Sequence, residues 1–310
     1  MTDSTTKTTI IVDSACSLPT SICNKYNVSF VPLTYTVNGE THRDPCSPKK
    51  NVELFQSDTL TSKNDVITTP PSPEDFESVI NKKIGEGYNR IIVQTVNRTQ
   101  GDTYNNANLA VSKISKSLPD KSTTVRVMDS RTVFAGQGLM AIETIRRLLK
   151  DKNHDEVRRK MDSLSEKIHT YIIPRDIVVA RARAASRNEN NISWMQAKVA
   201  STLGICPVVC NSNDSSYVPK KIRGFNNAAK ELFEHACSRI LEGLHSPIIT
   251  LNYVGSLDDL KALPGYDELS DLAAEKKITL VPSVASIAGG VYSSVGSVSL
   301  SLATDPHEWT

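Results

Sequence analysis

Short runs of hydrophobic residues alternate along the chain with longer stretches in which hydrophobic residues recur every three or four positions. Residues 8–12 and 28–33 are two such runs, and runs of this length between polar segments are typical of buried strands. Between them, Leu18 and Pro19 open a segment with helical spacing. The chain therefore begins with a β-α-β unit, which implies a parallel sheet with a right-handed crossover.

The alternation continues to the end of the chain, although residues 34–51 look irregular. In the second half, the pattern predicts the strands 205–210 and 247–253 and helices at 225–241, at 257–274 and from Ser193 onward. These elements indicate an α/β fold with a mainly parallel sheet in the first half. A short charged stretch at 151–153 leads us to predict two α/β domains, 1–160 and 161–310.

A strand beginning at Arg90 ends in a polar loop, and helical spacing begins again near Thr103. Loops at the carboxyl ends of parallel strands usually bind ligands, and the free N–H groups that open a helix favour an anion. Asp102 is the awkward residue, because its carboxylate would repel an anion. Two readings stay open: Asp102 faces the ligand, or it caps the helix with Thr103 as the first helical residue.

A stiff loop carries two neighbouring hydroxyl groups. Thr68 and Thr69 precede Pro70 and Pro71, and each proline disfavours helical backbone in the residue before it. Ser72 before Pro73, with two acidic residues after it, predicts the start of a helix. The two threonine hydroxyls are therefore expected at a fixed position ahead of this helix.

Two strands end in an aspartate followed by a serine, namely Asp13 with Ser14 and Asp129 with Ser130. Each pair is either functional or caps the next segment. Nothing in the sequence supplies a general base for either serine, and the six histidines are scattered, as surface histidines are. We therefore expect no enzymatic activity.

Charge, hydrophobic runs and cysteine spacing exclude several classes of protein and of site. The net charge is 36 − 34 = +2, which excludes a strong field for nucleic acid. No hydrophobic run approaches the ~18 residues that span a bilayer, and the polar start of the chain has no secretory core. We expect a cytoplasmic protein without stable membrane insertion. Cys206 and Cys210 flank an apolar stretch and have no zinc-type partners nearby, so we expect core thiols and no metal site.

Several motifs in order resemble those of the DegV family of bacterial lipid-binding proteins, over about residues 8–303. They are I-V-D-S-A-C-S-L-P at 11–19, V-P-L at 31–33, G-E-T-H-R-D at 39–44, T-T-P-P-S at 68–72, G-D-T-Y-N-N-A at 101–107, M-D-S at 128–130 and K-I-R at 221–223. The resemblance implies two α/β domains with a long-chain fatty acid buried between sheet and helices near the domain interface. Some members present the fatty acid to a kinase partner.

The resemblance also implies which residues hold the ligand carboxylate. Thr68 and Thr69 match the hydroxyl positions of the family's T-S-Q-P-S motif. The remaining positions are Asn97, Arg98, Gly101, Asp102, Thr103 and Ser294, with Lys221 and Arg223 at the basic rim.

This chain departs from the family at several of these positions. Gly101 and Asp102 replace the serine and glycine of the family's S-G-T, and Asn97 and Arg98 replace paired serines. Ser294 stands where the family has a histidine, and the basic G-G-R turn is replaced around residues 189–193. Arg98 could offset the charge of Asp102 by pairing with it or with the ligand.

Two hypotheses follow. The first is a non-catalytic carrier of a long-chain fatty acid or similar lipid, without cofactor. The resemblance adds the expectation that it presents the lipid to a fatty-acid kinase. The second is a divergent relative whose altered head-group site binds another small amphiphile, or which acts as an interaction module.

Overall fold

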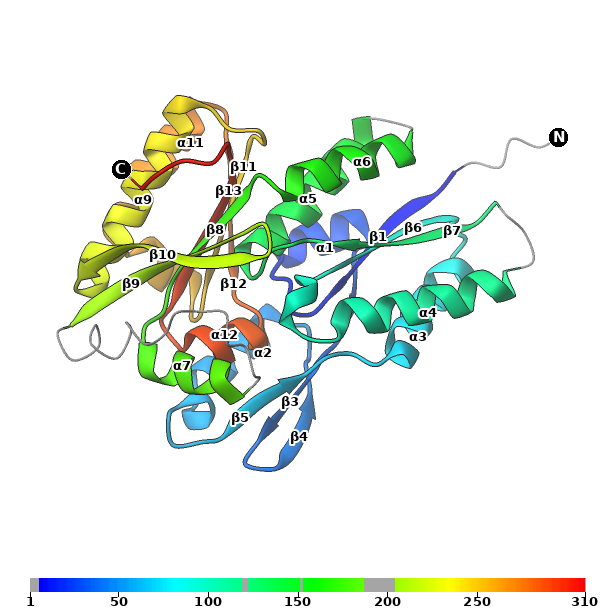
Figure 1. Ribbon diagram of the computed structural model, residues 1–310, viewed down its shortest axis with the longest axis horizontal. Helices are drawn as coiled ribbons and strands as arrows, with labels where there is room; N and C mark the ends of the chain where they lie inside the picture. Colours follow the sequence, from blue (N-terminus) through cyan, green and yellow to red (C-terminus); the bar gives the residue numbers. More distant parts are fainter. Residues whose placement is uncertain (1–5, 119–121, 151–152, 187–203, 310) are drawn as a thin grey trace.

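The computed structural model describes residues 6–118, 122–150, 153–186 and 204–309. Its first sheet has four parallel strands in the order β2-β1-β6-β7, which confirms the predicted parallel sheet. The strands are β1 (Thr8–Asp13), β2 (Ser29–Val31), β6 (Arg90–Thr95) and β7 (Thr124–Asp129). Their carboxyl ends point toward the centre of the molecule (Figure 1).

Helices cover both faces of this parallel sheet. On β1, Ile10 and Val12 pack with α5 and α6, whereas Ile11 packs with α3 and α4, as the two-residue repeat of a strand requires. Burial on both faces explains the continuous hydrophobic runs in the sequence. The helices of this half are α1 (Thr20–Tyr26), α3 (Pro73–Gly85), α4 (Thr103–Ser117), α5 (Ala135–Lys150) and α6 (His154–Ser165).

The second sheet has six strands in the order β10-β9-β8-β13-β11-β12 and is mostly antiparallel; β11 and β12 form its parallel pair. One of its faces packs on α9 and α11, and the other faces the parallel sheet and its helices. The strands are β8 (Ile168–Ile173), β9 (Ile205–Ser212), β10 (Ser215–Arg223), β11 (Ile248–Tyr253), β12 (Thr279–Val284) and β13 (Val298–Ala303).

The helices of the second half differ from prediction: the helices at 177–186 and 287–293 were not predicted, and one predicted helix is divided. The predicted helix 257–274 is two helices, because Pro264 disfavours helical backbone before it and Gly265 adopts a left-handed φ of +87°. The predicted helix from Ser193 begins outside the described residues. The helices are α7 (Ile177–Ser186), α9 (Phe225–Glu242), α10 (Leu257–Lys261), α11 (Tyr266–Glu275) and α12 (Ile287–Ser293).

A small antiparallel sheet lies where the sequence looked irregular. Asn38 and Gly39 both have positive φ. An Asn-Gly pair is a strong sequence signal for a tight hairpin, so this hairpin could have been predicted from the sequence. The strands, in the order β4-β3-β5, are β3 (Thr34–Val37), β4 (Glu40–Arg43) and β5 (Val66–Thr69), with α2 (Pro48–Gln56) and the short 3₁₀ helices η1 (Asp58–Leu60) and, after β6, η2 (Arg98–Gln100). The sheet holds Thr68 and Thr69 in place.

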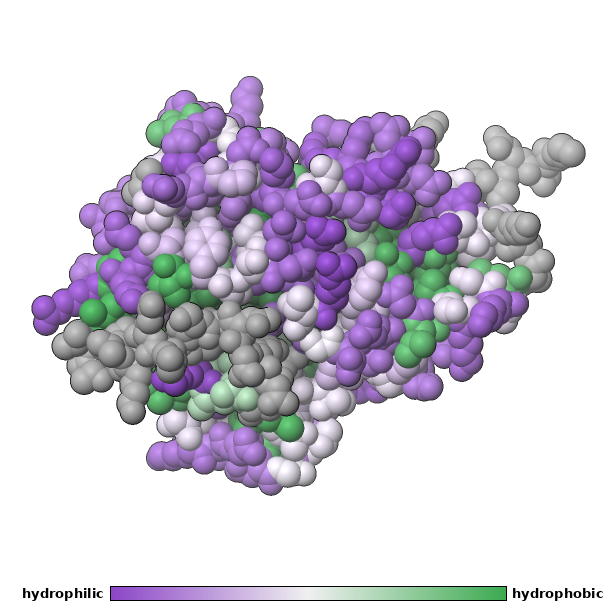
Figure 2. All heavy atoms as spheres, viewed as in Figure 1, coloured by the Kyte–Doolittle hydropathy of each residue, from purple (hydrophilic) through white to green (hydrophobic). Residues whose placement is uncertain are grey.

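Residues 160 and 161, the predicted domain boundary, fall inside α6. Val157 and Met161 of that helix pack in one cluster with Ile10 and Val12 of the parallel sheet, and the boundary itself stays a prediction. No described helix is long and apolar enough to cross a membrane. The face in Figure 2 is mostly hydrophilic, with hydrophobic residues in separate patches.

Candidate functional site

A cavity of about 100 Å³ lies between the two large sheets. A single ordered water needs about 10–15 Å³, so the cavity is more than a packing defect. Its walls come from the carboxyl edge of the parallel sheet, the loop after β5, the start of α4, the segment just before α5, strands β8, β9 and β10, and helices α7 and α12. They include a mixed cluster of buried apolar side chains from both halves: Ala15, Leu33, Val96, Val133, Ile172, Val209 and Ala288.

Thr68 and Thr69 line this cavity, as does Thr103. Thr68 is half-buried, and its Oγ1 lies 3.0 Å from the phenol oxygen of Tyr292 on α12, to which the backbone N–H of Thr68 also donates. Thr69 is exposed and Thr103 is buried. Three hydroxyl-bearing residues predicted as ligand-binding therefore meet at one cavity.

The loop that carries the two threonines is fixed at its far end. Ser72 and Asp75 form a reciprocal capping box at the start of α3, as the sequence predicted. The side chain of Asn106 on α4 donates to the carbonyl of Pro71 at 2.8 Å. The hydroxyl pair is thus tied to both α3 and α4.

The other predicted residues of the loop after β6 do not line the cavity: Asn97, Arg98, Gly101 and Asp102. Asn97 is fully buried, and its side-chain oxygen accepts from the backbone N–H and hydroxyl of Thr99. Gly101 has a φ of +108°, a conformation that L side chains rarely adopt. These two residues form the turn that places Thr103 at the cavity.

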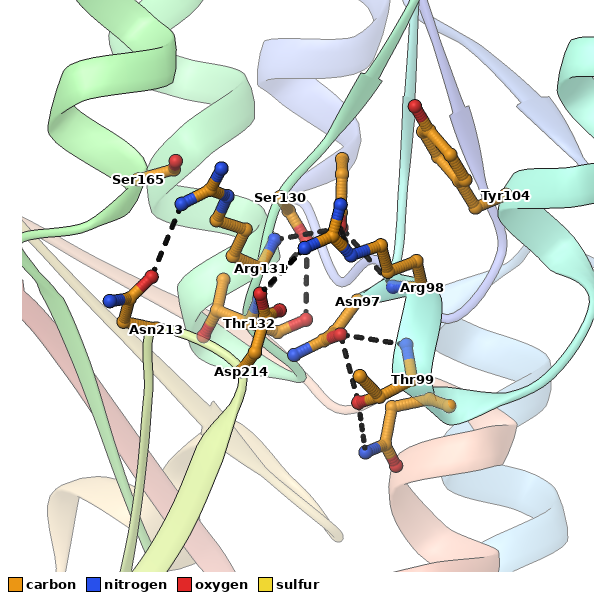
Figure 3. A network of polar contacts seen from close by, with 12 residues as sticks. Asn97, Arg98, Thr99, Tyr104, Ser130, Arg131, Thr132, Ser165, Asn213 and Asp214 are labelled. Atoms are coloured by element: carbon orange, nitrogen blue, oxygen red, sulfur yellow. Dashed lines mark hydrogen bonds and ion pairs between the residues drawn. The ribbon is translucent and has the colours of Figure 1, made fainter.

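Arg98 takes partners other than those the sequence suggested. Its guanidinium pairs with Asp129 at 3.5 Å and with Asp214 at 3.2 Å, whereas pairing with Asp102 or with a ligand was expected. Asp214 lies in the turn between β9 and β10, so this ion pair joins the two large sheets (Figure 3). Arg131 adds a 3.2 Å hydrogen bond to Asn213 of the same turn.

Asp102 occupies the N-cap position, and Thr103 is the first residue of α4 as predicted. The alternative in which the Asp102 side chain caps the helix is wrong, however, because that side chain makes no capping hydrogen bond and is exposed. The alternative, in which Asp102 faces the ligand, gains no support either, since Asp102 is not among the cavity residues. The carboxylate points to solvent.

Replacing Asp102 with glycine is therefore expected to change little. We predict a change of less than about 0.5 kcal/mol in the free energy of unfolding, the usual range for exposed positions without special contacts, and less than about twofold in lipid affinity. Urea unfolding and a fluorescent fatty-acid displacement assay measure the two quantities. Binding that tightens several-fold would instead place this carboxylate beside the ligand.

The Asp13 carboxylate is buried at the cavity wall and accepts three hydrogen bonds. They come from the backbone N–H groups of Ala15 at 2.9 Å and Val96 at 2.6 Å and from the side chain of Gln137 at 3.0 Å. Burial raises the pKa of Asp13 to about 6, and these donors limit the rise. Asp13 thus ties the ends of β1 and β6 to α5.

The Ser14 hydroxyl is held by two hydrogen bonds at the end of β1. It donates to a carboxylate oxygen of Asp44 at 2.9 Å and accepts from the backbone N–H of Leu33 at 3.0 Å. Burial raises the pKa of Asp44. The pair fastens the segment after β4 to the end of β1.

The second aspartate–serine pair is also structural. Asp129 accepts from the backbone N–H groups of Arg98 and Arg131, and burial raises its pKa. The fully buried Ser130 hydroxyl donates to the carbonyl of Thr132. The capping alternative fits both aspartate–serine pairs. Among the described residues, the Ser14 hydroxyl donates to the Asp44 carboxylate and the Ser130 hydroxyl donates to a backbone carbonyl.

The remaining predicted residues lie apart from the cavity lining. Ser294 is buried, and its hydroxyl accepts from the backbone N–H of Asp176 at 2.8 Å. Lys221 and Arg223 are exposed on the edge strand β10. None of these three residues is in the lining of the cavity that the threonines share.

Sequence reasoning missed two kinds of residue. Tyr292 and Asn211 line the cavity, yet neither lies in a recognisable motif; only the alternation of β9 would have pointed to Asn211. The interpretation of the histidines as surface residues is wrong for two of the six: His169 and His235 are buried, and His235 lies 3.1 Å from His307 beside the Tyr171 hydroxyl. This cluster lies on the α9 side of the second sheet, away from the cavity wall.

Comparisons with known proteins agree on one family. The model described as "Uncharacterised protein, DegV family" matches residues 7–305. A DegV domain-containing protein of Xanthomonas campestris pv. campestris is 26% identical over 309 residues, covering 97% of this chain and 98% of the relative.

Two solved structures are similar in fold. A stearic acid-binding protein from Eubacterium ventriosum has a TM-score of 0.79 at 19% identity, covering 95% of this chain and 97% of that one. The Streptococcus pneumoniae fatty acid kinase B3 protein, loaded with linoleic acid, has a TM-score of 0.73 at 20% identity, covering 96% and 100%. The predicted α/β fold is confirmed.

Proposed function

The chain belongs to the DegV family, and from this premise we propose that it is a non-catalytic carrier that binds a long-chain fatty acid or similar lipid in the cavity between its sheets. One observation carries the proposal. The cavity has an apolar wall built from both halves of the chain and three hydroxyl-bearing threonines on its lining.

The apolar wall suits an acyl chain. Each CH₂ group transferred from water into such a site contributes about 0.8 kcal/mol. For an acyl chain of ordinary length, the summed transfer free energy therefore exceeds the entropic cost of ordering the acyl chain in the site. The proteins similar in fold include a stearic acid-binding protein and a protein loaded with linoleic acid.

The hydroxyl groups suit the polar head. Thr68, Thr69 and Thr103 carry neutral hydroxyl groups that can donate hydrogen bonds to a carboxylate, so the site binds the head group without a positively charged side chain. Thr69 is exposed, so the head group would sit at the opening of the cavity. This placement is compatible with presentation to a kinase partner, for which the exposed Lys221 and Arg223 of β10 remain candidate contacts.

A second candidate has one observation in its favour. Ser294, where the family has a histidine, is buried and uses its hydroxyl to hold the backbone of Asp176. The site therefore has no basic group from this segment, and a less acidic head group than a carboxylate would fit it equally well. A divergent carrier of another small amphiphile remains the alternative.

Native mass spectrometry of the purified chain tests the proposal directly. We expect an added mass in the range of a C16–C18 fatty acid, or uptake of one when it is supplied. A chain that stays empty in the presence of added fatty acid would contradict the proposal. Uptake of a neutral amphiphile but no fatty acid would favour the alternative.

Removing the two loop hydroxyls is expected to weaken fatty-acid binding. Replacing Thr68 and Thr69 with valine keeps their shape but removes two donors, each contributing about 0.5–1.5 kcal/mol, so affinity should fall about tenfold. A displacement assay with a fluorescent fatty acid measures the change. Thr36 and Thr41, whose exposed hydroxyls bond each other at 3.0 Å on the same small sheet, provide the matched control pair, which should leave affinity unchanged.

A further inference from the structure

A row of small polar side chains crosses the second sheet on the face toward the cavity. Register pairs Thr250 with Ser301, Ser301 with Thr170, Thr170 with Asn211 and Asn211 with Ser216, so the row spans five strands from β11 to β10. Directly paired residues point to the same face of a sheet. Several of their strand neighbours on the opposite face, such as Leu251, Leu300 and Tyr171, belong to the cluster that packs on α9.

At one end of this row, every hydroxyl has a partner. Thr250 donates to the carbonyl of Ala135 at 2.6 Å, and Thr170 lies 3.0 Å from the Ser301 hydroxyl and 2.7 Å from that of Thr132. Ala135 begins α5 and Thr132 lies just before it. The start of α5 therefore covers and satisfies this part of the row.

At the other end, the row runs into the cavity and is not fully satisfied. Asn211 and Ser216 both line the cavity, and the Asn211 amide nitrogen donates to the Ser216 hydroxyl at 3.0 Å. Asn211 is 3% exposed, and its amide oxygen has no hydrogen-bond partner in the part of the chain that the structure describes. Turning the amide over would only exchange which polar atom is left unpaired.

An amide oxygen without a hydrogen-bond partner in an apolar wall does not favour an unsubstituted acyl chain. A buried polar atom without a partner is unfavourable, and sites built around one discriminate strongly for ligands that supply the missing group. Val209, two residues earlier on β9, faces the same cavity and shows what an apolar residue on this strand face would provide. The unpaired amide oxygen lies buried at this wall, and a rotation of the side chain toward the cavity would let it accept a hydrogen bond from a donor on the occupant.

We propose, on the basis of the carrier function proposed above, that Asn211 with Ser216 behind it forms a second polar subsite that binds a hydroxyl group carried on the acyl chain. The subsite is built from β9 and β10, separately from the threonines of β5 and α4. The occupant is then a hydroxylated fatty acid. Asn211 is the specificity-determining residue, and its amide oxygen accepts from the ligand hydroxyl.

Competition between matched lipids tests this proposal. The full-length chain is titrated, in the displacement assay, with stearic acid and with monohydroxystearic acids whose hydroxyl lies near the carboxyl end, at mid-chain or near the methyl end. We expect at least one hydroxylated acid to bind about tenfold more tightly than stearic acid. Binding of every hydroxylated acid within twofold of stearic acid, or weaker, would overturn the subsite.

Asn211→Leu provides the second measurement, because leucine has a similar volume and no polar atom. The variant should lose the preference for the hydroxylated acid over stearic acid. A preference that survives in Asn211→Leu, or equal weakening of all fatty acids, would overturn the proposal. If this variant fails to fold, the ranking of lipids by the wild-type chain still decides.

Failure of the carrier function is distinguishable from failure of the subsite. A wild-type chain that binds neither stearic acid nor any hydroxylated acid contradicts both proposals. A wild-type chain that binds them all equally contradicts the subsite alone. A loss of stability in Asn211→Leu without any change in the ranking would assign Asn211 a purely structural role.

Discussion

Gly136→Ala is expected to lower the free energy of unfolding by about 3 kcal/mol, near the upper end of the cost of overpacking a core. Gly136 is in the first turn of α5, where the helix rests on the second sheet. A Cβ atom at this position would lie 2.2 Å from the Oγ1 atoms of both Thr132 and Thr170. Those hydroxyls bond each other at 2.7 Å, so neither can move without breaking that bond.

Urea unfolding of the variant measures this effect. Gly85→Ala is the matched control, since Gly85 also lies in a helix and an added Cβ would meet nothing within 4 Å. The control should leave stability unchanged or raise it by up to about 1 kcal/mol, as alanine favours helix over glycine. Equal stability of Gly136→Ala and the wild type would mean that α5 does not sit this closely on the sheet.

The parallel sheet could be predicted from sequence because its signal is local. Strands buried on both faces are continuous apolar runs, and each helix that follows shows its own spacing. The start of α3 was equally readable, since Ser72, Pro73 and Asp75 are adjacent in the chain and form the cap without help from elsewhere. The predicted start of α4 at Thr103 was also correct, because the helical spacing begins there, although no side-chain cap forms.

The features that the sequence could not reveal depend on residues far apart in the chain. Arg98 pairs with Asp214 across 116 positions, and no local pattern selects that partner over Asp102. His169, His235 and His307 come together only because β8, α9 and the segment after β13 are neighbours in space. Asn211 enters the cavity wall through sheet register, which is set by pairing with β8 and β10.

Asp13→Ala is expected to destabilise the chain by about 4 kcal/mol. The substitution leaves three buried donors without an acceptor: the N–H groups of Ala15 and Val96 and the side-chain amide of Gln137. Each such loss costs about 1–3 kcal/mol, and removal of a buried charge returns part of the total. Urea unfolding at neutral pH measures the change, and Asp102→Gly, which removes an exposed carboxylate, is the control.

The size of this loss should depend on pH in a defined direction. Burial raises the pKa of Asp13 from 3.8 to about 6, so between these values the folded chain holds a proton that the unfolded chain has released. Protonation of Asp13 in the folded chain therefore adds stability that is fully present below pH 3.8 and is lost as the pH rises through 6, whereas the contribution of its three hydrogen bonds remains at neutral pH. A shift of about two units corresponds to roughly 3 kcal/mol.

The wild-type pH curve alone does not isolate this contribution, because the buried histidines act in the opposite sense. Burial lowers the pKa of His169 to about 4 and that of His235 to about 3, so their contribution to stability is present above pH 6.5 and is lost as the pH falls through those values. The difference between wild type and Asp13→Ala cancels the histidines. That difference should be larger at pH 4.5 than at pH 7; a difference that stays constant or grows with pH would show that Asp13 is ionised throughout and acts only as an acceptor for its three donors.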